Sequence, residues 1–176
     1  GNSTPRFKYG ITLDAAWKGF DFSIFMQGIG KRDLWLDGCY FWGANGQGNE
    51  WQSTGFAEHW DFFRPEGDPL GANLNSYYPR VNFSGDRNTK VQTRYLQNGA
   101  YLRLKNVQLG YTLPRVWTEK AGISSGRVYV SGDNLATITS LSKIFDPEAT
   151  GSLAGTGSGK LYPLQRVISV GVNVNF

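Results

Sequence analysis

The chain has 176 residues and a net charge of +4, and its charged residues, 18% of the total, are spread along the sequence rather than gathered into runs. This distribution gives no support to nucleic-acid binding, the single cysteine excludes an internal disulfide, and no apolar run approaches the roughly 18 residues of a membrane-spanning helix. The 23 glycines and 15% aromatic residues are typical of strands and loops. Because the sequence opens at Gly1 without an initiating Met, we expect a piece of a longer protein.

Two strands joined by a tight turn open the sequence. Apolar residues hold the odd positions of residues 7–17, and this period of two predicts a strand there. Lys18 and Gly19 interrupt the pattern, and a second alternating run predicts a strand over residues 20–28. A two-residue connection that ends in glycine favours a β-hairpin.

A third strand is predicted over residues 97–113, but its alternation changes parity. Leu104 and the apolar residues before it stand on even positions, whereas Val107 and those after it stand on odd positions. One extra residue near Lys105 or Asn106 explains the change. Such an insertion is typical of a β-bulge, in which two residues of one strand oppose one residue of its partner.

The remaining elements are a helical turn and two strands. Between Pro114 and Gly122, the residues from Trp117 to Ala121 favour one short helical turn that ends at glycine, and a weaker alternation predicts a strand over 127–135. The last strand, over 164–176, has the clearest alternation. Its apolar face consists of Ile168, Val170, Val172, Val174 and Phe176. This ending resembles the signal by which bacterial outer-membrane barrels are recognised by their assembly machinery, and an ordinary buried edge strand is the alternative.

The lengths of the connections alternate. Residues 18–19 form a short connection, 29–94 a very long one, 114–126 a medium one and 136–163 a long one. Outer-membrane barrels have short periplasmic turns and longer outer loops. With Phe176 on the periplasmic side, counting strands backwards places both long connections outside and the two shorter ones inside. The predicted fold class is therefore all-β, an antiparallel transmembrane β-barrel segment.

Several motifs follow one another along nearly the whole chain. They are Thr4-Pro5-Arg6-Phe7, Trp17-Lys18-Gly19-Phe20-Asp21, Phe25-Met26-Gln27-Gly28, the segment from Tyr101 to Pro114, the segment from Arg127 to Leu135, Phe145-Asp146-Pro147-Glu148, and Tyr162-Pro163. This series resembles the C-terminal barrel portion of the SusC/RagA family of TonB-dependent outer-membrane transporters of Bacteroidetes.

The resemblance implies a complete transporter with an N-terminal plug inside a barrel of about 22 strands, which imports oligosaccharides or peptides with energy supplied through TonB. This chain would supply about five strands and extracellular loops, and the plug domain would lie outside it. Five strands cannot close alone, because small bacterial barrels begin at about 8. The implied partners are a SusD-like surface lipoprotein, the TonB complex acting through the plug, the barrel-assembly machinery and outer-membrane lipid, with no cofactor.

Aromatic residues crowd the connection 29–94, and we expect some of them to contact substrate or a lid protein at the extracellular mouth. The candidates are Trp35, Trp42, Trp51, Trp60, Tyr77 and Tyr78. Alternatively, these rings form a small core of the loop itself, because rings bury large apolar areas and a connection this long needs packing to stay ordered. Near the short turn, Trp17 and Phe20 are candidates for the interface girdle.

An enzymatic site would have to use Glu58, His59 and Asp61, or Asp146 with Glu148. The only histidine has no second ligand at helical spacing, which argues against a zinc site and against a catalytic triad. Turn formation accounts for the Asp146-Pro147-Glu148 sequence. We therefore predict neither catalysis nor a metal site.

Two other classes of protein remain open at this point. A soluble, aromatic-rich β-sandwich that binds carbohydrate would share the short strands and the exposed rings, and it would fold in water without detergent. A secreted glycosidase fragment would need two carboxylates converging in a cleft. In the transporter interpretation, Asp14, Arg103 and Lys105 are candidates for lining the lumen or contacting the plug.

Overall fold

The computed structural model describes residues 1–36, 38–44, 55–82, 87–150 and 161–176. The chain forms two compact units. The sheet unit comprises Thr4–Arg32, Gly99–Ser140 and Leu164–Phe176, and the loop unit comprises Gly1–Ser3, Asp33–Asn98 and Leu141–Pro163. No helix within the described ranges is long and apolar enough to cross a bilayer.

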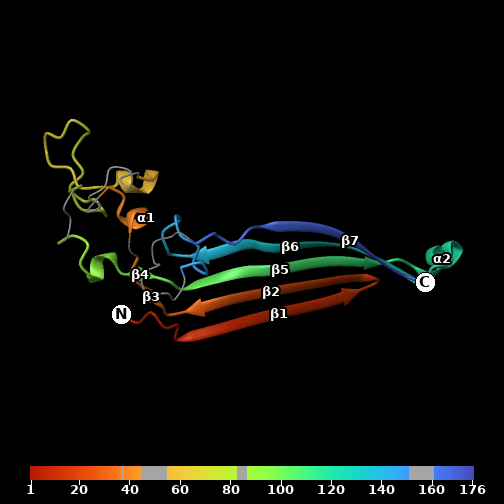
Figure 1. Ribbon diagram of the computed structural model, residues 1–176. Coiled ribbons are helices and arrows are strands. Elements are labelled where there is room, and N and C mark those ends of the chain that lie inside the picture. Colours follow the sequence, from red (N-terminus) through yellow and green to blue (C-terminus); the bar gives the residue numbers. More distant parts are fainter. Residues whose placement is uncertain (37, 45–54, 83–86, 151–160) are drawn as a thin grey trace. The chain divides into compact units, whose positions relative to one another are not determined.

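The sheet unit is one antiparallel sheet of five strands in the order β1-β2-β5-β6-β7 (Figure 1). These strands are β1 (Phe7–Trp17), β2 (Phe20–Gly30), β5 (Tyr101–Thr112), β6 (Ser125–Thr139) and β7 (Val167–Asn175). Each strand pairs with the next along the chain, which is the simplest way to satisfy the backbone hydrogen-bonding groups. The apolar alternation of each segment therefore becomes one continuous face.

The strand ends differ from the predicted ranges where pairing, rather than local pattern, decides them. Strand β6 continues through 136–139, residues predicted to begin the long connection, because Thr139 pairs with Tyr101 at the start of β5. Residues Gln97–Asn98 do not extend β5 but form β4, which pairs with β3 (Asp33–Leu34) in the loop unit. Strand β2 likewise runs to Gly30 rather than to residue 28, because its last residues pair with β1 and β5.

Both predicted local features of the sheet are present. Lys18 and Gly19 have positive φ angles of 47° and 88°, as a two-residue type I′ hairpin turn requires. In the β2–β5 pairing, Phe25 lies opposite Asn106 and Met26 opposite Leu104, so Lys105 is the extra residue of a bulge. The hairpin turn and the bulge are therefore confirmed.

The two faces of the sheet differ in chemistry. Residues of one face are apolar and uncovered within this chain, as Val170 with 78% exposure illustrates. Side chains of the other face bond to one another across strands: Asn106 donates to Asp133 (2.7 Å), and Arg103 donates to Thr137 (2.8 Å). This alternation is typical of a wall with lipid on one side and a polar interior on the other.

A salt bridge spans three strands of the polar face. Arg127 of β6 donates to both carboxylate oxygens of Asp21 on β2, and the bridge crosses Gly110 of β5. A Cβ at position 110 would collide with both charged groups, so only glycine leaves the space that the bridge occupies.

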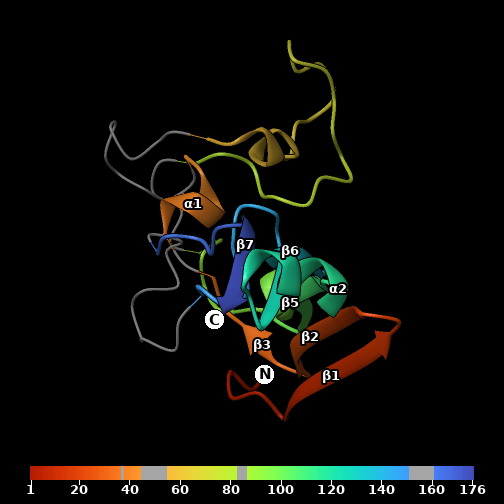
Figure 2. The ribbon, with the colours of Figure 1, turned by 90° about the vertical axis from the view of Figure 1, so that its right-hand side faces the viewer.

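Between the end of β5 and the start of β6, the chain forms the predicted helical turn. Helix α2 (Arg115–Thr118) continues into the 3-10 helix η4 (Glu119–Ala121), and Gly122 ends it in the left-handed conformation with φ 70°. Figure 2 views the molecule from this end, with α2 toward the viewer. Glycine is favoured at such a helix end because it has no Cβ to clash.

Two deletions test the bulge. Because Lys105 is the extra residue, its removal leaves a regular period of two with Leu104 and Val107 still on one face, and the protein should tolerate this change. Removing Leu109 instead would invert the alternation on one side of position 109 and turn residues such as Arg103 toward the apolar face, at about 2–4 kcal/mol for an arginine near the centre of the bilayer that the family resemblance implies. We expect the folded fraction of the full-length protein to fall at least about tenfold when Leu109 is deleted and much less when Lys105 is deleted, measured by heat-modifiable migration in gels. Equal losses of folding for the two deletions would contradict the bulge.

Candidate functional site

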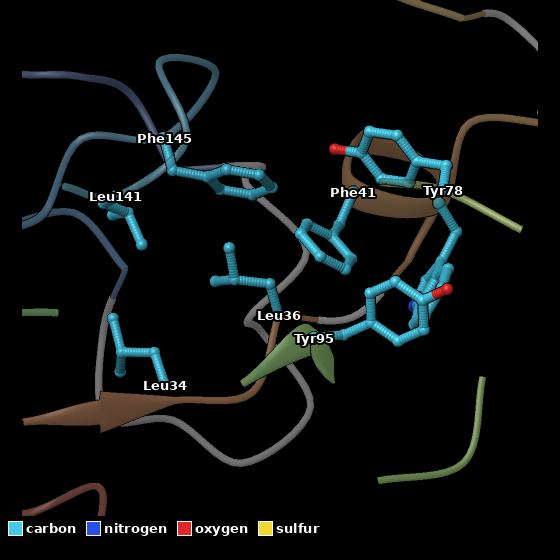
Figure 3. Packing of buried hydrophobic residues seen from close by; sticks show 8 residues of the cluster. Leu34, Leu36, Phe41, Tyr78, Tyr95, Leu141 and Phe145 are labelled. Atoms are coloured by element: carbon cyan, nitrogen blue, oxygen red, sulfur yellow. The ribbon is translucent and has the colours of Figure 1, made fainter. Parts of the chain in front are cut away.

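The loop unit has its own aromatic core, and Phe41 of helix α1 (Cys39–Trp42) lies at its centre (Figure 3). The ring of Phe41 packs against four other rings, with centroid distances of 5.0 to 6.5 Å. The buried members of the cluster are Leu34, Leu36, Phe41, Trp42, Tyr78, Tyr95, Leu141 and Phe145. Segments from both long connections therefore share one core.

Partly buried hydrogen bonds tie this core to the chain around it. Tyr78 donates its hydroxyl to Glu58 Oε1 (3.0 Å), and Ser142 donates to Glu58 Oε2 (2.9 Å). Burial, and then the charge of Glu58, raise the pKa of the Tyr78 hydroxyl far above its ordinary value. The phenol therefore keeps its proton at neutral pH and remains the donor to the carboxylate. Glu58 thus joins the two long connections.

A second group of bonds shapes the segment that follows. Asp61 accepts a bond from the Asn73 amide (2.9 Å) and one from the backbone N–H of Tyr77 (3.1 Å). Arg64 is buried and donates to the carbonyls of Trp60 (3.0 Å) and Gly71 (2.7 Å). These side chains hold the backbone of residues 60–78 in place, which is a structural role.

His59 is fixed by two backbone groups. Its Nδ1 accepts from the N–H of Phe56 (2.9 Å), and its Nε2 lies 3.0 Å from the carbonyl of Phe41. An acceptor at Nδ1 and a carbonyl at Nε2 require the neutral ring with its proton on Nε2. Because both nitrogens are engaged, the ring orients the loop.

An aromatic pocket of about 250 Å³ opens beside His59. Its lining is Trp42, Ala44, Gly55, Phe56, His59, Trp60, Phe62, Tyr78, Pro79 and Val81. Of these lining rings, Trp42 is only 3% exposed and belongs to the core, whereas Trp60 is 60% exposed. The polar groups of His59 and Tyr78 are already bonded, whereas the buried indole N–H of Trp42 has no partner among the described residues. The pocket therefore offers ring and aliphatic surface beside one unpaired N–H donor.

The structure brings three of the six predicted contact residues to this pocket, namely Trp42, Trp60 and Tyr78. Trp35 and Tyr77 instead pack against the core, with Trp35 6.0 Å from the Trp42 ring. Trp51 lies outside the described residues. Sequence reasoning missed Phe56, Phe62 and Val81 as lining residues; their apolar character was visible, but nothing in the spacing marks them as neighbours.

Other predicted positions are found on the sheet. Trp17 and Phe20 face each other across the hairpin on the apolar face, and the Phe20 ring lies 4.6 Å from that of Tyr111. The alternating apolar residues of β7 share this face. Their assigned roles in the interface girdle and in barrel assembly stay predictions. Asp14 and Arg103 lie on the polar face, as candidates for lining the lumen require.

The carboxylates considered for catalysis have structural partners. Asp146 accepts a bond from the Glu148 N–H (2.9 Å), and its carbonyl accepts from Ala149 and Thr150, which is a turn as predicted. No cluster of metal-ligating side chains is found in the part of the chain that the structure describes. The long strands form one sheet with an exposed apolar face rather than two sheets packed as a sandwich.

Comparison with known proteins agrees with this arrangement. No family model matches the chain, but two proteins of Formosa agariphila align with all of it, TonB-dependent receptor P3 at 31% identity and TonB-dependent receptor P26 at 28%. The solved RagAB peptide importer aligns with 99% of the chain, in its "open-open" state (TM-score 0.73, 26% identity) and its "closed-closed" state (TM-score 0.73, 27% identity).

The chain spans 17% of the length of both curated relatives and 17–18% of the importer chains. A two-faced antiparallel sheet that aligns throughout with such proteins is a wall segment of an outer-membrane β-barrel. More particularly, the chain is similar over its whole length to part of the TonB-dependent receptors, and the resemblance to the SusC/RagA type is confirmed. These relatives are receptors and importers rather than enzymes, and the sandwich and glycosidase alternatives are set aside.

Replacing Trp42 tests the aromatic core. Trp42→Ala removes a buried ring and should destabilise the loop unit by about 3–5 kcal/mol, whereas Trp60→Ala, which removes an exposed ring, should cost much less. Limited proteolysis of the full-length receptor, followed by mapping of cleavages within 33–98, measures the difference. Equal protease resistance of the two variants would show that Trp42 does not support the core.

Proposed function

We propose that the complete protein is a TonB-dependent importer of the bacterial outer membrane, with peptides as its first-choice substrates and oligosaccharides as the second. The observation that carries this proposal is the alignment of 99% of the chain with the RagAB peptide importer at 26% identity. The sheet unit would supply part of the barrel wall. The loop unit, inserted where β2 and β6 end and where β5 and β7 begin, would contribute to the extracellular mouth.

The chemistry of the pocket supports peptides. Sugars are recognised through several hydroxyl groups that need free donors and acceptors beside an aromatic platform. His59 and Tyr78 have theirs engaged within the protein, and the indole N–H of Trp42, which has no partner among the described residues, is a single donor that one peptide carbonyl would satisfy. The remaining surface of Trp60, Phe56 and Val81 suits an apolar side chain, which gains about 25 cal/mol for each Å² removed from water. We infer that the pocket holds one such side chain of a bound peptide.

The proposed partners follow from the family resemblance. A SusD-like surface lipoprotein would close over the extracellular mouth, and the TonB complex would act through a plug encoded outside this chain. The barrel-assembly machinery would receive the strand that ends at Phe176. The loop-unit candidates Trp35, Tyr77 and Trp51 stay proposals as contacts to substrate or lid.

Uptake experiments test the importer proposal. Cells that carry the full-length receptor should accumulate peptides from a mixed peptide library, and deletion of tonB should abolish the uptake. Oligosaccharides tested in parallel reveal the second-choice substrate. Uptake that persists without TonB would overturn the proposal.

A variant of the pocket tests the site itself. Trp60→Ala should weaken peptide binding by about 1–2 kcal/mol, or roughly 5- to 30-fold in Kd, as measured by calorimetry on the purified receptor. Tyr162→Ala is the matched control, because Tyr162 is a largely exposed ring of the same unit that does not line the pocket. Equal affinities of the two variants would exclude the pocket as the binding site, even if uptake is TonB-dependent.

A further inference from the structure

The connection between β5 and β6 presents apolar side chains where a turn in water would be polar. Trp117 of helix α2 is 63% exposed, and its neighbour Val116 is similarly exposed. The segment is well ordered by hydrogen bonds: Trp117 N–H donates to the Pro114 carbonyl (2.9 Å), and Ile123 N–H to the Thr118 carbonyl (3.0 Å). The exposed pair is therefore held in a defined position.

Helix α2 lies on the apolar side of the sheet. Thr118 is only 3% exposed, and a Cβ placed on Gly126 of β6 would meet Leu113 Cδ1 at 3.1 Å and Thr118 Cγ2 at 3.6 Å. Gly126 is paired with Val174 and stands two residues before Val128, on the face with the apolar alternation. The methyl group of Thr118 thus covers the apolar face at this end of the wall.

Helix geometry then gives the direction of the exposed pair. Successive residues of an α-helix are rotated by about 100°, so Val116 projects from the side of the helix opposite to Thr118. Trp117 lies between them on one flank. Because Thr118 points toward the sheet, Val116 projects away from the sheet and Trp117 projects along it. Both side chains therefore lie on the side of the sheet's apolar face.

The charges near this helix are mostly basic. Arg115 and Lys120 flank the exposed pair, against one acidic residue, Glu119. At the same end of the sheet, Lys18 holds its ammonium 4.9 Å from the ring centroid of the exposed Trp17. The nearby carboxylate of Asp21 is already bonded to Arg127. Amphipathic rings with basic neighbours are typical of the headgroup level of a bilayer, where Lys and Arg attract anionic lipids.

We propose that helix α2 is a membrane-interface anchor that inserts Trp117 and Val116 at the headgroup boundary of the periplasmic leaflet, with Arg115 and Lys120 on phospholipid phosphates. The argument for lipid as the occupant is continuity: α2 covers the same apolar face that the barrel wall presents to the membrane. The inference rests on the outer-membrane placement of the proposed importer but not on its substrate. A periplasmic protein bound to the helix is the competing occupant.

Depth-dependent quenching tests the anchor. The full-length receptor, with its native cysteines replaced, is labelled with a fluorophore at Trp117→Cys and reconstituted into vesicles of phosphatidylethanolamine and phosphatidylglycerol that contain phospholipid brominated near the headgroup. Val130→Cys on the apolar face and Ser131→Cys on the polar face are the matched controls. We expect quenching at 117 and 130 to be several-fold stronger than at 131.

The outcomes separate the anchor from the barrel placement. Quenching at 130 but not at 117 or at a second site, Val116→Cys, would overturn the anchor while leaving the barrel intact, and would favour a periplasmic protein as the occupant. Absence of quenching at 130 as well would overturn the membrane placement on which both depend. Heat-modifiable migration of each labelled variant verifies folding. Changing Arg115 and Lys120 to Gln should weaken quenching at 117 only when phosphatidylglycerol is present.

Discussion

The pairing of backbone hydrogen-bonding groups is the constraint on which the rest of this structure depends. In hydrocarbon, each unpaired N–H or C=O costs several kcal/mol, so a strand is stable there only between two others. Pairing is continuous from β1 to β7, and one edge of each outer strand has no partner among the described strands. The ladder also fixes which side chains face outward. Three local features keep the strands paired: the type I′ turn, the bulge at Lys105 and the space over Gly110. None of them moves the apolar side chains to the polar face of the sheet.

Local pattern was sufficient to predict much of the sheet. A period of two locates a strand that is half buried, glycine marks a tight turn or a helix end, and a change of parity marks a bulge. The end of β6 was not predictable in this way. Asn134 has a positive φ of 52° beside a second irregularity, and the strand resumes through 136–139 only because the start of β5 pairs with it. That partner is more than thirty residues away, beyond the reach of a local pattern.

The candidate pocket was less predictable, because burial in the loop unit is decided by contacts distant in sequence. Trp42 and Trp60 are the same residue type in the same aromatic stretch, yet one is enclosed by Phe41 and Tyr95 while the other is open to solvent. The backbone bonds of His59 are equally invisible in the sequence. Residue type indicated that rings would matter, and only the fold distinguishes support of the core from surface available to a ligand.

The shared core of the two long connections has a consequence for how such proteins diversify. Leu36 and Phe41 come from the first connection and Leu141 and Phe145 from the second, and Glu58 bonds to Ser142 across the two. If one connection were exchanged between related genes, the buried residues of the other connection would lose the side chains against which they pack. A replacement loop unit therefore keeps its core only if both parts, residues 33–98 and 141–163, come from the same protein.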